Sequence, residues 1–319
     1  MSGRTRRLLW GLAFGLAVVV GLMLYSDLSK LARSLEAFDG AVLLPVCSIV
    51  LLGYGIRTIK WEIYLHRLDI RVGRLESAWV FFSGLVMAIS PMKVGEVLKS
   101  FLLKQHHKIP IARTAPIIVA ERLTDVLALI LLASLGALST GFGVAVVAVA
   151  AALSALAIGV LASPRLSRFF LSLLGKLPFF SRFAHRFDQA YESMLQLIGP
   201  KTLITTTLLS VLAWGGEGVA CWWIVNGFDG VNAPLGEVVF IFSFATLAGA
   251  LSMLPGGLLA TEGSMIGLLH GVFHLMPNQS MATAATLITR FCTLWFAVIL
   301  GAAALFGYQR RHRTGGEAA

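Results

Sequence analysis

Residues 254–263 read Leu254-Pro255-Gly256-Gly257-Leu258-Leu259-Ala260-Thr261-Glu262-Gly263, and they place a Pro–Gly break around one Glu inside an apolar stretch. An earlier stretch has the same character, Ser90-Pro91-Met92-Lys93-Val94-Gly95-Glu96. A broken helix at membrane depth is tolerated only where it lines a cavity or is buried in protein. Paired breaks in corresponding places of two halves point to the binding site of a transporter. The two breaks therefore predict a membrane protein that moves a substrate.

The composition is that of a protein embedded in a bilayer. Of 319 residues, 57% are hydrophobic and 13% are charged, and the mean hydropathy is +0.82. Soluble domains carry about 25% charged residues. We predict an all-α polytopic membrane protein with about six full transmembrane helices and two re-entrant helical hairpins, because several apolar runs approach the length that spans hydrocarbon. The whole chain, 1–319, is interpreted as a single integral membrane domain.

The net charge of +10 does not indicate nucleic-acid binding, because the basic residues are spread between the predicted spans. Arg57 and Lys60, for example, are interpreted as part of the basic loop after the second span. An excess of Lys and Arg marks cytoplasmic loops, so both termini are expected in the cytoplasm. The expected location is the inner membrane of a bacterial cell.

The apolar pattern gives the expected order of elements. The first hairpin, 77–103, has basic residues at both ends and is expected to enter from the cytoplasm, with Ser90 as N-cap and Pro91 opening the return helix. The second, 236–276, has no basic flanks and is expected to enter from outside. Residues 164–200 are interpreted as helices in the cytoplasmic interface or as a basic loop packed on the bundle. The predicted full spans are 8–25, 41–64, 114–139, 144–162, 203–225 and 282–306.

The two halves have the same plan in opposite orientations. Span, hairpin, span occurs over about 41–139 and again, upside down, over about 203–306. The spacing agrees as well: Arg122 follows Glu96 by 26 residues, and Arg290 follows Glu262 by 28. Inverted repeats with broken helices at mid-membrane are a shared plan of secondary transporters.

Charged residues in the apolar segments predict a polar centre. A charge at the bilayer centre costs about 2.5–3.5 kcal/mol on insertion scales, so these groups are expected to face one another or a cavity. One arrangement places Glu96 and Glu262 near Arg122 and Arg290. Arginine matches phosphate oxygens, and helix N-termini favour anions, so anionic lipid headgroups fit. The alternative is that the charges only lock the bundle together.

The expected site residues form two sets. The substrate-binding set is Arg122, Arg290, Lys93, Lys99, Glu96, Glu121, Asp125 and Glu262. The residues expected to shape the hairpin tips are Ser90, Pro91, Gly95, Pro255, Gly256 and Gly257.

Other chemistry is not indicated. His270 and His274 are four residues apart, but they lack the accompanying Glu of a metal motif, so no metal site is expected. The cysteines Cys47, Cys221 and Cys292 are interpreted as buried small hydrophobes. No phosphate-binding Gly-rich loop and no Ser/His/Asp arrangement stands out. No cofactor and no catalytic residue are therefore assigned.

The motifs together resemble a known family. Pro91-x-x-x-Gly95-Glu96-x-x-Lys99, then Glu121-Arg122-x-x-Asp125, then Leu254-Pro255-Gly256-Gly257 with Glu262, are similar to the lysylphosphatidylglycerol synthase transmembrane-region family. The resemblance covers about 10–305 and implies a flippase-like role. Some members carry an additional aminoacyl-transferase domain, and this chain is not expected to perform that synthesis alone. Where a third Gly often follows the first Leu in the family, this chain has Leu259.

We therefore expect translocation of an anionic lipid or a lipid-linked group between leaflets. The cargo classes that the resemblance implies are anionic phospholipids, polyprenyl-phosphate-linked lipids and hopanoid-type lipids. Two alternatives stay open: a membrane-embedded transferase acting on a lipid headgroup, with Glu96 as its acid or base, and a non-catalytic scaffold for a biosynthetic enzyme. A homodimer, or a partner biosynthetic enzyme, is the expected assembly.

Overall fold

The structure is a computed structural model that describes residues 28–90, 96–138 and 192–314, with the single positions 148, 149, 152 and 159. Within these residues the chain is helical, and the one extended pairing is an isolated bridge between Phe38 and Phe228. The predicted all-α class is therefore confirmed. The predicted span 8–25, nearly all of 144–162, most of the 164–200 loop and the tip 91–95 lie outside the described residues.

Three described helices are long and apolar enough to cross a membrane, which supports a multi-pass protein. They cover Gly40–Arg67, Pro200–Asn226 and Gln279–His312. Helix α6, Ile111–Ala137, has 27 residues and is also long enough. It carries three charged residues near its middle, however, and so it lacks a window as apolar as those of the other three.

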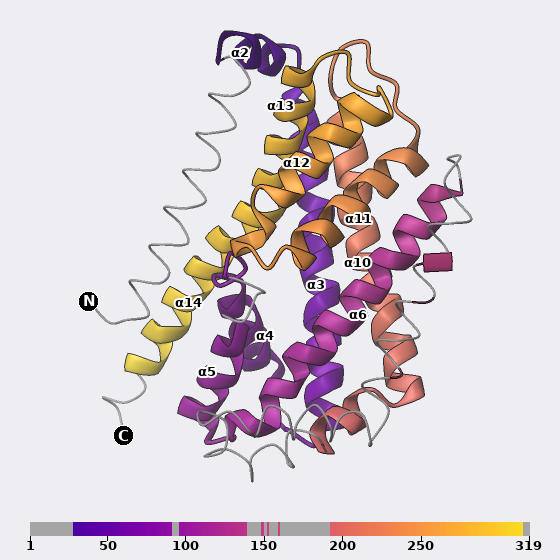
Figure 1. Ribbon diagram of the computed structural model, residues 1–319. Coiled ribbons are helices and arrows are strands. Elements are labelled where there is room, and N and C mark those ends of the chain that lie inside the picture. The colour runs from indigo at the N-terminus through magenta and orange to yellow at the C-terminus, as the bar shows by residue number, and fades with distance from the viewer. Residues whose placement is uncertain are drawn as a thin grey trace, which may run out of the picture.

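The long helices form the frame of the bundle (Figure 1). Helix α3, Leu43–Arg67, packs along α10, Pro200–Asn226, and α10 also contacts α6. Asn278 caps α13, Gln279–Arg290, by accepting a hydrogen bond from the Met281 amide. The remaining elements of the frame are η1 (Gly40–Val42), the short helix α2 (Leu28–Glu36), the π-helix η6 (Phe291–Trp295) and α14 (Phe296–Thr314).

The first hairpin consists of α4, Arg74–Leu85, and α5, Val97–His107. Glu96 is at the N-cap position of α5, and the Ser90 hydroxyl donates a hydrogen bond of 2.7 Å to the Met87 carbonyl. Pro91 and Gly95 lie outside the described residues, so the expected capping role of Ser90 stays a prediction. The described helices match the predicted hairpin, 77–103, to within a few residues.

The second hairpin is broken where Pro and Gly interrupt the sequence. Its elements are α11 (Leu235–Leu251), the 3-10 turn η4 (Pro255–Gly257), α12 (Ala260–Ile266) and the π-helix η5 (Gly267–Val272). Gly256 and Gly257 have φ of 60° and 68°, a region that favours glycine. Leu259 adopts φ 69° and ψ −49° without that freedom. The backbone of Leu259 is therefore strained at this turn.

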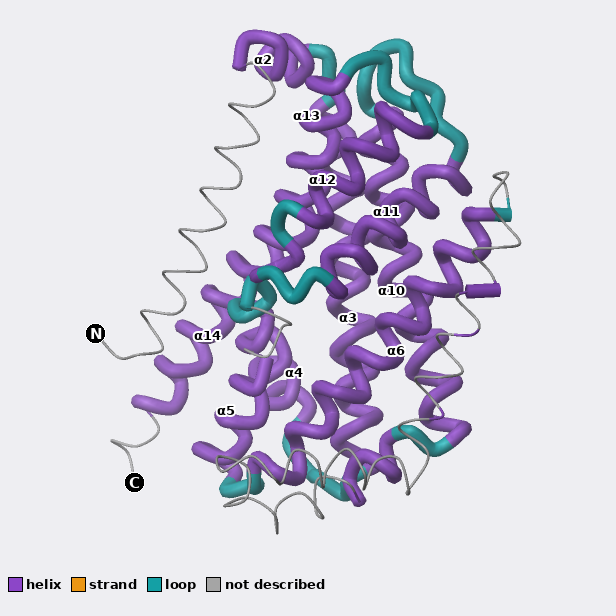
Figure 2. The backbone as a smooth tube through the Cα atoms, viewed as in Figure 1, coloured by secondary structure: helices purple, strands orange, loops and turns teal. Residues whose placement is uncertain are grey.

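The two hairpins lie toward opposite ends of the bundle, and the end of α4 approaches the break of the second hairpin near the middle (Figure 1). Figure 2 shows the loop residues of the second break at mid-height, away from the loops that join helices at the two ends. A Cβ placed on Gly256 would lie 3.5 Å from the Cα of Ile89, so the second break touches the segment that follows α4. Similarly, a Cβ on Gly301 of α14 would collide with the backbone of Leu85 and Val86. The last helix therefore packs directly on the first hairpin.

Candidate functional site

A cavity of about 470 Å³ lies where the two breaks meet the long helices. Pockets of about 300–1,000 Å³ are the usual size for small-molecule and cofactor sites. Charged side chains of α3, α5, α6, α10 and α13 line part of it, and apolar residues of α4, α6, α11 and α14 line most of the rest. The charged residues of the lining are Arg57, Lys60, Glu96, Lys99, Glu121, Arg122, Asp125, Glu217 and Arg290.

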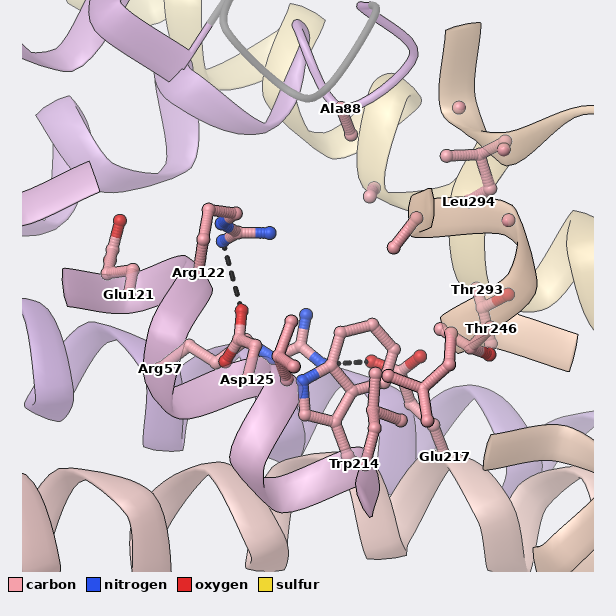
Figure 3. A pocket seen from close by; sticks show the side chains of 18 of the residues that line it. Arg57, Ala88, Glu121, Arg122, Asp125, Trp214, Glu217, Thr246, Thr293 and Leu294 are labelled. Carbon is pink, nitrogen blue, oxygen red and sulfur yellow. Dashed lines mark hydrogen bonds and ion pairs between the residues drawn. The ribbon is translucent and has the colours of Figure 1, made fainter. Parts of the chain in front are cut away.

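Asp125 is the centre of the first ion-pair group. The Lys60 ammonium donates to its Oδ1 at 2.7 Å, and the Ser210 hydroxyl donates to the same oxygen at 3.0 Å. Arg122, one turn away on α6, reaches the other oxygen at 3.1 Å, as Figure 3 shows. The two residues are three positions apart on α6, a spacing that brings side chains together on one face of a helix.

Lys99 of α5 joins the first hairpin to α6. Its ammonium lies 2.6 Å from Glu121 and 3.4 Å from Glu96, and it sits over the Trp61 ring at 4.7 Å. The stem of Lys99 crosses Gly84 of α4, where a Cβ would come within 2.5 Å of the Lys99 Cγ. The lysine is consequently held by charge, by an aromatic face and by close packing.

A second group joins α3 to α10. The Arg57 guanidinium reaches Glu217 at 2.6 Å and lies 4.2 Å from the centre of the Trp214 ring (Figure 3). The interpretation of Arg57 and Lys60 as loop residues after the second span is wrong, because both lie inside α3, and Lys60 is only 2% exposed. Their acidic partners on α10 and α6 satisfy the charge within the bundle.

The third group holds the break of the second hairpin. Arg290, at the end of α13, donates from Nε to Glu262 at 2.6 Å and from Nη2 to the Gly256 carbonyl at 2.5 Å. The π-helix η6 begins at the next residue, and π-turns inside helices are frequent at functional sites. Within η6, the Thr293 carbonyl accepts a hydrogen bond of 2.7 Å from the Tyr54 hydroxyl of α3.

The two arginines that correspond in the predicted repeats have different surroundings. The Arg290 side chain is 13% exposed and makes two short hydrogen bonds. The Arg122 side chain is 31% exposed, its ion pairs are longer, at 3.1 and 3.4 Å, and its buried Nε has no hydrogen-bond partner among the described residues. Of these two arginines, Arg122 is therefore the one with donors left for a ligand, and Arg290 is the one that holds backbone in place.

The structure brings most of the sequence-predicted residues together. Glu96, Lys99, Glu121, Arg122 and Asp125 form one continuous network, in which Arg122 lies 3.4 Å from Glu96 as the sequence predicts. The predicted pairing of Glu262 with Arg290 is also present. Their expected role in substrate binding stays a prediction. Ser90, Gly256 and Gly257 line the cavity; Pro255 opens η4; Lys93, Pro91 and Gly95 lie outside the described residues.

The site residues that sequence reasoning missed are Arg57 and Lys60, with Tyr54 and Trp214 beside them. Glu217 is predicted, as a charge in an apolar segment, to face another charge or a cavity, but it is not in the predicted substrate-binding set. A signal was present in the spacing, because Tyr54, Arg57, Trp61 and Tyr64 recur every three or four residues and so share one helix face. That face is the buried one.

The other candidate groups do not extend the site. His270 contacts the Met276 carbonyl through Nδ1 at 3.0 Å, and the described residues contain no cluster of His, Cys, Asp and Glu suited to a metal ion. Cys47, Cys221 and Cys292 are free thiols, of which the last two are buried.

Comparison with known proteins gives two findings. A family model described as "Lysylphosphatidylglycerol synthase TM region" matches residues 12–301. A UPF0104 membrane protein of Methanothermobacter thermautotrophicus is 23% identical over 327 residues, which is 92% of this chain and 93% of that protein. A further match to a UPF0104 membrane protein of the same organism is 36% identical over 95 residues, which is 30% of this chain and 27% of that protein.

Proposed function

Because the chain belongs to the lysylphosphatidylglycerol synthase TM region family, we propose that it moves an anionic lipid or lipid-linked group between the leaflets of a bacterial inner membrane. The observation that carries the proposal is that one wall of this cavity is charged and another is apolar. A phosphate-bearing headgroup needs guanidinium and ammonium donors, whereas acyl chains need apolar surface. Both surfaces border the same space here.

Arg122 is the proposed contact of the headgroup phosphate. Its guanidinium is the most exposed of the cationic groups whose ion pairs border the cavity, and its Nε has no partner among the described residues. The planar fork of arginine matches two phosphate oxygens at once. Glu96 and Asp125 hold the guanidinium in the empty site and release it when phosphate replaces them.

The acyl chains are proposed to remain toward the bilayer on the side of α6 and α11. Val126 and Leu127 of α6 and Ala250 and Leu251 of α11 line the cavity. Leu251 is 77% exposed although it lines the cavity, so the space reaches the outer surface of the bundle there. A lipid that keeps its tails in hydrocarbon while its headgroup crosses requires such a lateral opening.

The two hairpins are proposed to be re-entrant elements of an inverted repeat, with the first entering from the cytoplasm, where both termini lie. Support comes from their position toward opposite ends of the bundle (Figure 1) and from the contact of Gly256 in the second hairpin with Ile89 in the first. Displacement of one hairpin at a time would expose the cavity to one side of the membrane, which is the alternating access expected of such repeats.

Transport by purified protein in liposomes tests the proposal. The assay follows loss of fluorescent phosphatidylglycerol or polyprenyl phosphate from one leaflet. We expect Arg122→Gln to slow transport by about tenfold or more, because a hydrogen bond to a charged group contributes about 1.5–3 kcal/mol. Arg122→Lys, which keeps the charge without the fork, should fall between Arg122→Gln and the wild type.

Lys104→Gln is the matched control, because Lys104 is an exposed cation on α5 that does not line the cavity. It should transport at the wild-type rate. An unchanged rate in Arg122→Gln would remove the assignment of Arg122, and absence of transport in the wild type with both lipids would contradict the proposed function. Mass spectrometry of lipids that copurify with the protein would then distinguish the remaining cargo classes.

A further inference from the structure

Glu262 carries a buried carboxylate oxygen with no partner. The residue is 2% exposed, and its Oε1 accepts the hydrogen bond from Arg290. Its Oε2 is fully buried and has no hydrogen-bond partner, and among the described carboxylates it is the only such oxygen. An unsatisfied buried group costs about 1–3 kcal/mol, and more when it is charged. A proton on Oε2 would remove the charge that makes this burial costly.

The charge that Glu262 faces is Arg290. Helix α12 packs against α11, α13 and η5. These elements carry one titratable or charged residue each: Glu237, Arg290 and His270. Glu237 is in the first turn of α11, at the end opposite the break, and His270 contacts the Met276 carbonyl. Protonation of Glu262 would therefore act on one partner, the Arg290 guanidinium.

The charges around the cavity balance among the residues that the structure describes. Five are basic and five are acidic, counting Glu262 behind the Arg290 that lines the cavity. An anionic headgroup brings one further negative charge into this enclosed space, where an uncompensated charge is costly. One proton taken up with each such headgroup restores the balance.

We propose that the cavity takes up a proton together with an anionic headgroup, and that Glu262 is the group that binds the proton. The inference rests on the proposed function. The proton arrives from the aqueous side to which the cavity is open and binds Oε2. The neutral carboxyl then holds Arg290 less strongly, so that the guanidinium turns donors toward the phosphate.

When the headgroup leaves on the other side, Arg290 returns to Glu262 and the proton departs to that side. By linkage, each ligand raises the affinity for the other by the same factor. A proton gradient would thus drive accumulation of the anionic lipid in one leaflet.

The experiment uses the full chain in liposomes with a trapped pH dye, either with fluorescent phosphatidylglycerol or with fluorescent phosphatidylcholine. A pH gradient is imposed in each direction, and both lipid transfer and internal pH are recorded. For phosphatidylglycerol we expect a several-fold difference in transfer rate between the two gradient directions, together with proton movement. Zwitterionic phosphatidylcholine should give neither.

Two variants locate the proton site. Glu262→Gln imitates the neutral carboxyl, so whatever rate of phosphatidylglycerol transfer it has should be equal in the two gradient directions and should occur without proton movement. Glu237→Gln removes a carboxylate from the same hairpin at a distance from the cavity, and it should respond as the wild type does. Thermal unfolding of each purified variant shows whether its fold is intact.

The outcomes separate the two proposals. Wild-type transfer of phosphatidylglycerol at the same rate in both gradients would overturn proton uptake and leave the proposed function standing, and this arm needs no variant. Transfer of phosphatidylcholine but not of phosphatidylglycerol would overturn proton uptake in favour of a zwitterionic cargo. A full gradient response in Glu262→Gln would overturn the assignment of Glu262. No transfer of any lipid would overturn both proposals.

Discussion

Lys60 shows what a buried ionic group requires of a membrane helix. Its ammonium has a carboxylate at 2.7 Å and a hydroxyl at 2.8 Å, so the charge is satisfied inside the bundle. Removing one member of a buried pair leaves the other uncompensated and costs about 3–5 kcal/mol in soluble proteins. The partner here is Asp125, which keeps a contact to Arg122.

We expect Lys60→Met to lower the unfolding temperature in detergent. The loss of unfolding free energy should be about 3 kcal/mol, the lower end of the range for a broken buried pair. The double variant Lys60→Met/Asp125→Asn should recover part of the loss, because it also removes the stranded charge. Tryptophan fluorescence during heating measures both. A single variant as stable as the wild type would contradict the buried-pair interpretation.

Leu259 has an unfavourable backbone conformation whose effect on stability can be measured. Its φ of 69° with ψ of −49° is strained for a residue with a Cβ, and its side chain is exposed. Leu259→Gly should therefore stabilise the folded state by about 1 kcal/mol, less the entropy that glycine gains on unfolding. Chemical denaturation of the two proteins gives the difference. Destabilisation by the glycine would show that the Leu259 side chain contributes more packing than its backbone costs.

The sequence predicted that Glu96 and Glu262 lie near Arg122 and Arg290, because an unpaired charge in an apolar segment is too costly to leave alone. The pairing of Arg57 with Glu217 and of Lys60 with Asp125 was not predicted. The rule that basic residues mark cytoplasmic loops treats each cation as exposed. It therefore led to a wrong position for Arg57 and Lys60, which lie inside α3. Only their partners on distant helices distinguish the two cases, and sequence spacing does not show such contacts.

At the scale of elements, α4, α5 and α14 meet in a cluster of titratable side chains. The His312 Nε2 lies 2.7 Å from Glu76 Oε1, the His107 Nε2 lies 3.5 Å from the same oxygen, and the His106 ring packs on His312 at 4.0 Å. Burial raises the pKa of Glu76, but hydrogen bonds with His312 and Tyr308 outweigh burial and place that pKa below its ordinary value. Burial, followed by the charge of His312, lowers the pKa of His106.

Both pKa shifts make the folded protein less stable in acid. The unfolded chain binds a proton at His106 and then at Glu76 at a higher pH than the folded protein does, so stability rises with pH over these ranges. We expect the unfolding temperature to fall as the pH drops below 6.5, the unperturbed value for His106, and again below 4.5, that for Glu76.

Glu76→Gln should flatten the lower part of this profile and His106→Gln the upper part, as measured by unfolding temperature against pH. A matched substitution outside the cluster, Glu36→Gln on the exposed face of α2, should leave the profile unchanged. A wild-type profile that rises toward acid would contradict the assignment.

The hairpins were predictable as elements because Pro and Gly punctuate them. The predicted 77–103 and 236–276 correspond to α4 with α5 and to α11 through η5. The π-helices η5 and η6 were not predicted, since a one-residue widening of a helix leaves no mark in an apolar pattern. The first of the predicted spans lies outside the described residues, so its prediction stays untested.

The orientation of the whole molecule in the membrane can be tested at two exposed residues on opposite sides of the predicted topology. Lys104 lies near the end of α5 and Asp229 in the loop after α10, and both are exposed. In a protein whose native cysteines are replaced by alanine, we expect Lys104→Cys to be labelled from the cytoplasm only and Asp229→Cys from outside only. Membrane-impermeant maleimide applied to cells and to inverted vesicles makes the measurement. Labelling of both from one side would contradict the predicted topology.

One contact limits how this molecule can change shape. Helix α14 meets the end of α4 at Gly301 with no space for even a methyl group between the two backbones. Any motion that parted them would leave a void, or bare peptide groups, at a depth where no water is available to fill it. The first hairpin and the last helix must then shift together as one piece. The π-helix η6, which follows Arg290, is where the chain can bend when the first hairpin and the last helix move together.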